Sequence, residues 1–162
     1  PGGEIFTALQ QGAIDAAECV GPYNDLAFGL YRAAKYCYYP GWQEPGPTLE
    51  CMVNKTAYES LPDDLKAILD ACCRAINDDM LAEYTARNQE ALKQLVETHK
   101  VQFRRLPDPV LAALREQSEA VLAELAAKDA FAKRVYDSFS AYRDQVRAWS
   151  AVSEVPYFQA RT

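Results

Sequence analysis

The chain has 162 residues, 49% of them hydrophobic and 25% charged, so it has the composition of a globular protein and not of a disordered one. Its 17 lysines and arginines are outnumbered by 23 aspartates and glutamates, and the net charge of −6 disfavours nucleic acid and anionic membranes as partners. No run of about 18 apolar residues is present to span a bilayer. The chain opens on Pro1-Gly2-Gly3 with no initiator methionine and no signal peptide, so we expect a mature product or a fragment.

Several short elements are predicted in the first third of the chain. Residues 4–12 have the apolar spacing of a short helix that ends at a glycine. The apolar run 16–20 lies between an aspartate and a Gly-Pro turn, which predicts a buried strand. A second helix is expected over 24–34, and two more strands over 35–39 and 48–54.

A helical pattern dominates from residue 55 onward. Ser60, followed by Pro62 and Asp63, has the composition of a capped helix start. An apolar stripe then continues to about residue 98 with no Gly or Pro to interrupt it. The stripe predicts either one long helix or two helices with a break at 77–79.

The remaining chain predicts one more strand and two more helices. Residues 101–104 alternate like a short strand, a helix is expected to open at residue 108, and Asp129 is expected to cap the last helix. The tail 150–162 shows no clear period. Together the elements predict a mixed α and β fold with an excess of helix and a parallel or mixed sheet. The sheet has too few strands to be complete, so part of the fold is expected to be missing or supplied by a partner.

Catalytic and zinc-binding patterns are weak. His99 is the only histidine and is interpreted as a surface residue at the end of the long helix. No G-x-S-x-G, Walker or G-x-G-x-x-G motif occurs, although paired carboxylates in space are not visible in a sequence. The cysteines show no C-x-x-C spacing and are interpreted as small buried hydrophobic residues, with a disulfide between two of them left open. They are Cys19, Cys37, Cys51, Cys72 and Cys73.

Glu18 is the most unusual charged residue of the sequence. It lies inside the apolar run 16–20, and a carboxylate is costly to bury unless it is paired or liganded. One interpretation is an edge position at which Glu18 points to water. The other is a carboxylate at the C-terminal end of a strand, where open α/β sheets bind their ligands and where a hard cation would find an oxygen donor.

An aromatic cluster with one acidic residue surrounds a Pro-Gly turn. Aromatic side chains wall many ligand pockets, and a charged group among them can orient the ligand. The other interpretation is that the alternating tyrosines pack one face of a sheet. The members of the cluster are Tyr36, Tyr38, Tyr39, Trp42 and Glu44.

Several segments, in order and at the expected spacing, resemble one known family. They are similar to the DctP-type solute-binding proteins of TRAP transporters, and in particular to the subgroup that binds 2-oxo acids or related small monocarboxylates with a cation. The resemblance covers essentially the whole chain and the C-terminal half of the family's mature protein. The segments are PGGEIF at 1–6, QGAIDA at 11–16, ECVGP at 18–22, YYPGWQEPG at 38–46, VNK at 53–55, DMLA at 79–82 and VRAWS at 146–150.

The resemblance implies a partial α/β fold of the type II periplasmic-binding-protein kind, helix-rich, with a few short mixed strands and long C-terminal helices. Residues 1–162 would form one C-terminal portion of a two-lobed protein, with a hinge and cleft segment at 1–54 and a mainly helical segment at 55–162. The implied role is binding and not catalysis. The two lobes would close on a small organic carboxylate and a calcium or sodium ion, without an organic cofactor, and deliver the solute to permease subunits from the periplasm.

The resemblance also implies roles for particular residues. Glu18 matches the position that gives a carboxylate to the bound cation. The next position, usually tryptophan in the family, is Cys19 here; it would contact both cation and substrate and leave a larger pocket. Tyr39, Trp42 and Glu44 are expected to line the substrate pocket. The arginine that binds the substrate carboxylate belongs to the family's N-terminal half, so no arginine of this chain is assigned that role.

The apolar stripe of the last helix predicts a dimer contact, and Cys19 in place of tryptophan together with the absent N-terminal half favours an alternative function. Some members of the subgroup dimerise by exchanging a C-terminal helix, and residues 131–149 would do so here, so a homodimer is expected. The alternative is a truncated or degenerate relative that no longer binds solute and acts as a dimeric helical interaction module. A response to ligand separates the two. A third interpretation, an enzyme that uses Glu18 and Glu44 as acid and base, would require turnover of a carboxylate.

Overall fold

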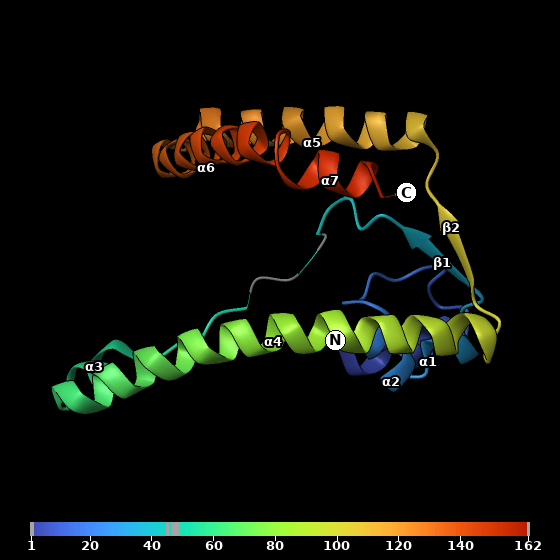
Figure 1. The fold of residues 1–162 in the computed structure, drawn as a ribbon, viewed down its shortest axis with the longest axis horizontal. Coiled ribbons are helices and arrows are strands. Elements are labelled where there is room, and N and C mark those ends of the chain that lie inside the picture. The colour runs from blue at the N-terminus through green and yellow to red at the C-terminus, as the bar shows by residue number, and fades with distance from the viewer. Residues whose placement is uncertain (1, 45, 47–48, 162) are drawn as a thin grey trace. The chain divides into compact units, whose positions relative to one another are not determined.

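The computed structural model describes residues 2–44, 46 and 49–161, and it divides into two compact units, Pro1–Leu106 and Pro107–Thr162. Most of the described chain is helical (Figure 1). The first unit contains η1 (Gly2–Glu4), α1 (Ile5–Gln10), α2 (Pro22–Ala27), η2 (Leu30–Arg32), β1 (Tyr36–Tyr39), α3 (Lys55–Glu59), α4 (Asp63–Glu97) and β2 (Gln102–Arg105). The second unit contains α5 (Asp108–Lys128), α6 (Ala130–Ser150) and α7 (Glu154–Gln159).

The two helical segments at the start of the chain differ in how well the sequence predicts them. The helix expected over 4–12 is confirmed as η1 and α1. The single helix expected over 24–34 is wrong, because the chain forms α2 and then the separate 3-10 turn η2. Gly29 lies between them with a φ of 69°, in the left-handed region that glycine enters without a steric penalty. One residue in that conformation ends α2 and redirects the chain.

One two-stranded parallel sheet joins distant parts of the first unit. β1 and β2 pair in register from Tyr36 with Gln102 to Tyr39 with Arg105, which confirms the strands predicted over 35–39 and 101–104. The strands predicted over 16–20 and 48–54 are wrong. Residues 16–20 and 49–54 are in no strand, and Thr48 lies outside the described residues. A strand needs a hydrogen-bonded neighbour, and within the described residues β1 and β2 pair only with each other.

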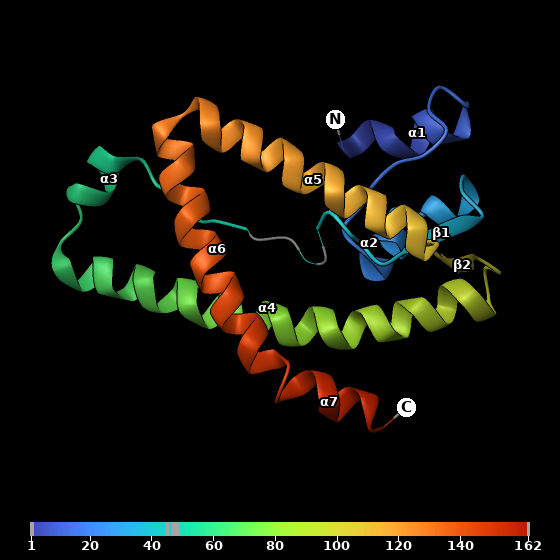
Figure 2. The same ribbon diagram turned by 90° about the horizontal axis from the view of Figure 1, so that it is seen from above.

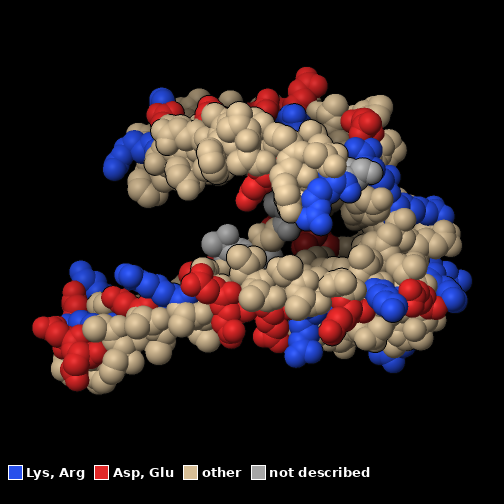
Figure 3. Space-filling view, viewed as in Figure 1, with Lys and Arg blue, Asp and Glu red and all other residues tan. Residues whose placement is uncertain are grey.

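The long apolar stripe forms a single helix, α4, of 35 residues, without the break considered at 77–79. The predicted cap at Ser60 is wrong. Ser60 ends α3, where its hydroxyl donates a hydrogen bond to the carbonyl oxygen of Ala57, and α4 begins after Pro62 without a side-chain cap. Acidic and basic side chains are interspersed along α3 and α4 (Figure 3), including the i,i+4 pair of Arg87 and Glu83. Such exposed pairs stabilise a helix by only a few tenths of a kcal/mol each. The stability of α4 therefore depends on packing at one end of the helix.

That packing is against α2, which lies beside the C-terminal half of α4 (Figure 2). Ala91 and Leu95 on α4 are each only 2% exposed. The ring of Tyr23 meets that of Tyr84 edge to face at 5.8 Å, and the backbone N–H of Tyr23 donates to Oδ1 of Asn88 at 3.0 Å. The buried core of the first unit therefore lies where α2 crosses α4.

A tight turn after α4 brings β2 to β1. Lys100 adopts a left-handed φ of 59°, and its Nζ donates to the carbonyl oxygen of Glu97 at 2.7 Å. His99, which the sequence predicted at the surface, is half-buried because its ring stacks on Tyr31 with centroids 3.7 Å apart. Val101 follows as a buried residue, and the chain then enters β2.

The second unit is a pair of long helices with a short helical end. Asp129 caps α6 as predicted, its carboxylate accepting a hydrogen bond from the N–H of Ala132 at 2.6 Å. α5 and α6 pack against each other. The short helix α7 was not predicted, because its six residues are too few to show a period. Across the described residues, no helix combines the length and the apolar character needed to cross a membrane.

Candidate functional site

A cavity of about 590 Å³ lies within the first unit. Most of its wall is apolar, and two carboxylate side chains open onto it. A mainly apolar hollow with a few charged groups is the usual form of a small-molecule site. Its lining residues are Gly2, Gly3, Ile5, Phe6, Glu18, Cys19, Val20, Phe28, Leu30 and Glu44.

Four short stretches of chain supply this wall. The beginning of α1 contributes Phe6, whose ring is also covered by the guanidinium of Arg32 at 5.0 Å. Phe28 and Leu30 flank the left-handed Gly29, so the break between α2 and η2 turns both side chains to the cavity. The loop before α2 contributes Glu18 to Val20, and the loop after β1 contributes Glu44.

Three of the five residues expected in the site share this cavity. Glu18, Cys19 and Glu44 line it, although Glu44 lies 25 positions after Cys19 in the chain. Tyr39 and Trp42 are not among the lining residues. They are 47% and 45% exposed at the end of β1 and in the loop that carries Glu44. Their role as pocket wall therefore stays a prediction.

The apolar wall of the cavity was not predicted from the sequence. Phe6 belongs to the short helix expected over 4–12, and Phe28 and Leu30 belong to the one continuous helix expected over 24–34. The available signal was Gly29, since a glycine inside a helical pattern often marks a break. A break there would have placed its two large neighbours on a turn instead of in a helix face.

A half-buried group of acidic and thiol side chains lies behind Glu18. Burial raises the pKa of Asp25 above its ordinary value of 3.8, a hydrogen bond from Cys19 opposes this, and the charge of Glu18 adds to it. Burial also raises the pKa of the Cys19 thiol, a backbone hydrogen bond from Val20 lowers it, and the charge of Asp25 raises it again. Among the described residues, Oδ1 of Asp25 is buried without a hydrogen-bond partner. Negative charge at this position is therefore costly.

Asp25→Asn is expected to raise the melting temperature at pH 7. The raised pKa means that the folded state holds the Asp25 proton more tightly than the unfolded chain does. The penalty for ionising it in the folded state appears as the pH rises above 3.8 and is absent below that value. The amide keeps the shape and an acceptor for Cys19 without the charge. Circular dichroism melts at pH 3 and pH 7 measure the change.

Asp78→Asn is the matched control, because Asp78 is exposed on α4. It should change the melting temperature little at either pH. If Asp25→Asn raised the melting temperature equally at pH 3 and pH 7, the electrostatic explanation would be contradicted.

The cavity offers oxygen donors of the kind that hard cations prefer. Ca²⁺ takes about 6–8 oxygen ligands, and carboxylates and backbone carbonyls are the usual ones. Glu18 and Glu44 bring two carboxylates to the cavity. In the part of the chain that the structure describes, no group of three or more His, Cys, Asp or Glu side chains could hold a metal ion. The chain therefore fits a hard cation as part of a coordination shell and not as the whole of it.

The helix-rich fold and the mainly apolar cavity together indicate a ligand-binding protein. Residues 1–129 match the family DctP, described as bacterial extracellular solute-binding protein, family 7, and the chain belongs to this family. The fold predicted from the resemblance, a partial periplasmic-binding-protein fold with few strands, is confirmed by solved TRAP periplasmic solute-binding proteins of the same fold. The family is one of transport proteins and not of enzymes.

Several relatives cover nearly all of this chain. The monocarboxylate 2-oxoacid-binding periplasmic protein of Nostoc sp. is 44% identical over 159 residues, which are 97% of this chain and 43% of that protein. A TRAP periplasmic solute-binding protein from Pseudoalteromonas atlantica, solved with sodium and pyruvate, is 41% identical with a TM-score of 0.92 and covers 98% of this chain. One from Colwellia psychrerythraea, solved with calcium and pyruvate, is 39% identical with a TM-score of 0.92 and the same coverage.

A third solved relative, from Bordetella bronchiseptica, is 34% identical with a TM-score of 0.95 over 99% of this chain. It is described as a mixed-occupancy dimer with copurified calcium and picolinate in one site and an apo second site. Each of the three solved chains is covered only to 48%. The present chain thus spans less than half the length of these relatives.

Proposed function

We propose that this chain contributes to the binding of a small organic carboxylate of the 2-oxo acid kind together with a calcium or sodium ion. The observation that carries the proposal is the meeting of Glu18 and Glu44 at one mainly apolar cavity. The Nostoc relative is named for 2-oxo acids, and two solved relatives hold pyruvate with sodium or with calcium. A cation beside the cavity explains why two carboxylates line a site for an anionic solute.

In this proposal Glu18 gives a carboxylate oxygen to the cation, and Cys19 contacts cation and solute next to it. Glu44 belongs to the same wall, and Tyr39 and Trp42 approach the solute from the end of β1. When bound, the cation supplies positive charge that offsets both carboxylates and attracts the carboxylate of the solute. The apolar residues Phe6 and Phe28 exclude water from the rest of the solute.

The proposal extends to transport by the whole protein. Ligand binding would shift an equilibrium between open and closed lobes, and the closed form would deliver the solute in the periplasm to the permease subunits of a TRAP transporter. A homodimer is part of this proposal. Large apolar residues of α6, among them Phe131, Phe139 and Trp149, are 56–68% exposed, which favours burial against a second copy. Sedimentation equilibrium should then give twice the chain mass of 18.1 kDa.

A thermal melt with millimolar pyruvate and calcium tests the binding proposal. A ligand that binds only the folded state stabilises it by about 2.7 kcal/mol at a hundredfold excess over Kd, so the melting temperature should rise by several degrees. Glu18→Gln should abolish the rise, since the amide keeps the shape and removes the charge. Glu50→Gln, at an exposed position outside the cavity, should leave it intact.

The same melt tests the alternative. A cooperative transition that no carboxylate shifts, with calcium or with sodium, would contradict binding by this chain. Such a result, together with a dimeric mass, would favour the helical interaction module without solute. A rise that Glu18→Gln leaves unchanged would remove Glu18 from the cation site.

A further inference from the structure

Arg32 lies next to the cavity without being part of its wall. It is the last residue of η2, it is exposed, and it is not among the lining residues. Its guanidinium carbon lies 5.0 Å from the centre of the ring of Phe6, which does line the cavity. Among the residues that the structure describes, no carboxylate lies within ion-pair distance of Arg32. Its guanidinium therefore serves contacts other than an ion pair.

The second contact of this guanidinium is with Gly29. The carbonyl oxygen of Gly29 accepts hydrogen bonds from the backbone N–H of Arg32 at 3.0 Å and from its Nε at 3.5 Å. A β-carbon added to Gly29 would lie only 2.5 Å from Nη2 of Arg32, so the guanidinium occupies the space that a side chain would need. Gly29 is thus suited to its position by its left-handed φ and by the room that it leaves for Arg32.

Arg32 therefore connects two parts of the cavity wall. One part is Phe6 on α1, and the other is the pair Phe28 and Leu30 on either side of Gly29. In the described chain, no hydrogen bond or ion pair runs from α1 to α2 or η2. A cation is attracted to the negative face of an aromatic ring, so the Arg32 guanidinium holds Phe6 towards the turn at Gly29.

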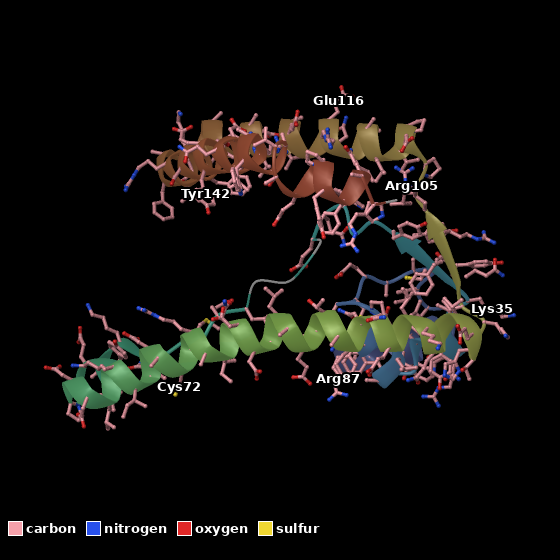
Figure 4. All side chains as sticks on the ribbon, viewed as in Figure 1. Lys35, Cys72, Arg87, Arg105, Glu116 and Tyr142 are labelled. Atoms are coloured by element: carbon pink, nitrogen blue, oxygen red, sulfur yellow. The ribbon has the colours of Figure 1, made fainter. Side chains whose placement is uncertain are left out.

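Arg87 provides a comparison from the same unit. Its guanidinium carbon lies 5.9 Å from the ring of Tyr23 on α2, and its Nε lies 3.3 Å from a carboxylate oxygen of Glu83. Figure 4 shows Arg87 on the lower side of α4. Arg87, Tyr23 and Glu83 are not among the residues that line the cavity. Arg87 is therefore a second cation over a ring in this unit, but one that acts away from the cavity.

We propose that Arg32 is a positioning residue that sets the distance between the two parts of the wall and thereby favours 2-oxo acids with an apolar side chain. The proposal rests on the proposed binding of a 2-oxo acid at this cavity. The side chain of such a solute lies between Phe6 and the pair Phe28 and Leu30. Arg32 does not line the cavity, so it acts on the solute through these three residues.

Solutes of different length depend on this wall to different extents. Each methylene group that is buried contributes about fourfold in affinity. Pyruvate has only a methyl group to place against the wall, whereas 4-methyl-2-oxopentanoate has an isobutyl group. Movement of Phe6 away from the turn at Gly29 should therefore weaken binding of the longer solute more than binding of pyruvate.

Isothermal titration calorimetry of the chain with these two solutes, in calcium, tests the proposal. The wild-type chain should bind 4-methyl-2-oxopentanoate more tightly than pyruvate. Arg32→Gln should raise the Kd of the longer solute about fourfold or more and that of pyruvate by less than about twofold. Arg87→Gln is the matched control and should leave the ratio of the two Kd values unchanged. A purely structural loss would raise both values by the same factor.

A double-mutant cycle with Phe6→Leu tests the contact itself. Leucine removes the ring that the guanidinium covers and keeps an apolar side chain in the wall. In the Phe6→Leu background, Arg32→Gln should no longer change the ratio of the two Kd values. In urea denaturation without ligand, the unfolding equilibrium constant of the double variant should rise about two- to fivefold less than the product of the two single increases.

Three results would overturn the proposal. Equal weakening of both solutes by Arg32→Gln would mean that Arg32 binds the solute carboxylate or affects only folding. Independent effects of the Arg32 and Phe6 substitutions would show that their contact does not hold the wall. A wild-type chain that binds both solutes equally would show that the wall does not contact the longer side chain. Absence of binding by the wild-type chain would instead contradict the proposed function, and the cycle without ligand would still decide whether Arg32 joins the two parts of the wall.

Discussion

Leu95→Ala is expected to destabilise the first unit by about 3 kcal/mol. Leu95 is 2% exposed at the point where α2 packs on α4, and removal of a buried leucine side chain leaves a cavity that neighbours fill only in part. Urea denaturation followed by the fluorescence of Trp42, in a Trp149→Phe background, reports on the first unit alone. The midpoint should fall well below that of the parent chain.

Leu81→Ala is the matched control for this change, since Leu81 lies on the same helix and is 71% exposed. Leu81→Ala should lower the free energy of unfolding by no more than about 0.5 kcal/mol. Equal losses for the two variants would show that α4 is buried over most of its length and would contradict a core confined to its C-terminal end.

Asn88→Ala is the second change with a large expected effect, about 1–3 kcal/mol. Oδ1 of Asn88 accepts the hydrogen bond of the Tyr23 N–H at the start of α2, and alanine leaves that partly buried donor without its partner. Gly21, directly after Val20, passes close to the same oxygen, since a β-carbon added there would lie 3.3 Å from it. We therefore expect the variant to lose part of the ligand-induced rise in melting temperature as well.

Asn77→Ala controls for the helical preference of alanine. Asn77 is exposed on α4, and its replacement should be neutral or slightly stabilising. Urea denaturation compares the two variants, and pyruvate-dependent melts compare their responses. If Asn88→Ala were as stable as Asn77→Ala, the hydrogen bond would not be what holds α2 to α4.

The predictions that succeeded are those that depend on local signals. The cap at Asp129 follows from a side chain that reaches the N–H three residues on. The helix from residue 63 to 97 is one of the two alternatives that the apolar stripe left open, the other being two helices with a break at 77–79. Strands at 36–39 and 102–105 were recognisable from composition and alternation. Each of these requires information from only a few neighbouring residues.

The predictions that failed depend on partners far along the chain. Residues 16–20 have the composition of a strand, but the described chain gives them no neighbouring strand to pair with. Ser60 has the residue type of a cap, yet α3 ends there and uses its hydroxyl for Ala57. A propensity states what a segment can form, and the hydrogen-bond partners available in the fold decide what it does form.

The sequence by itself was enough to predict the family, the helical content and three residues that meet at the cavity, Glu18, Cys19 and Glu44. Residue order carries this information, because the segments that resemble the family include Glu18, Cys19 and Glu44, whereas Glu18 itself is exposed in the structure. Only the tertiary structure decided that Phe6, Phe28 and Leu30 complete the wall of the cavity. This wall depends on the break at Gly29, which brings side chains from different elements to one cavity.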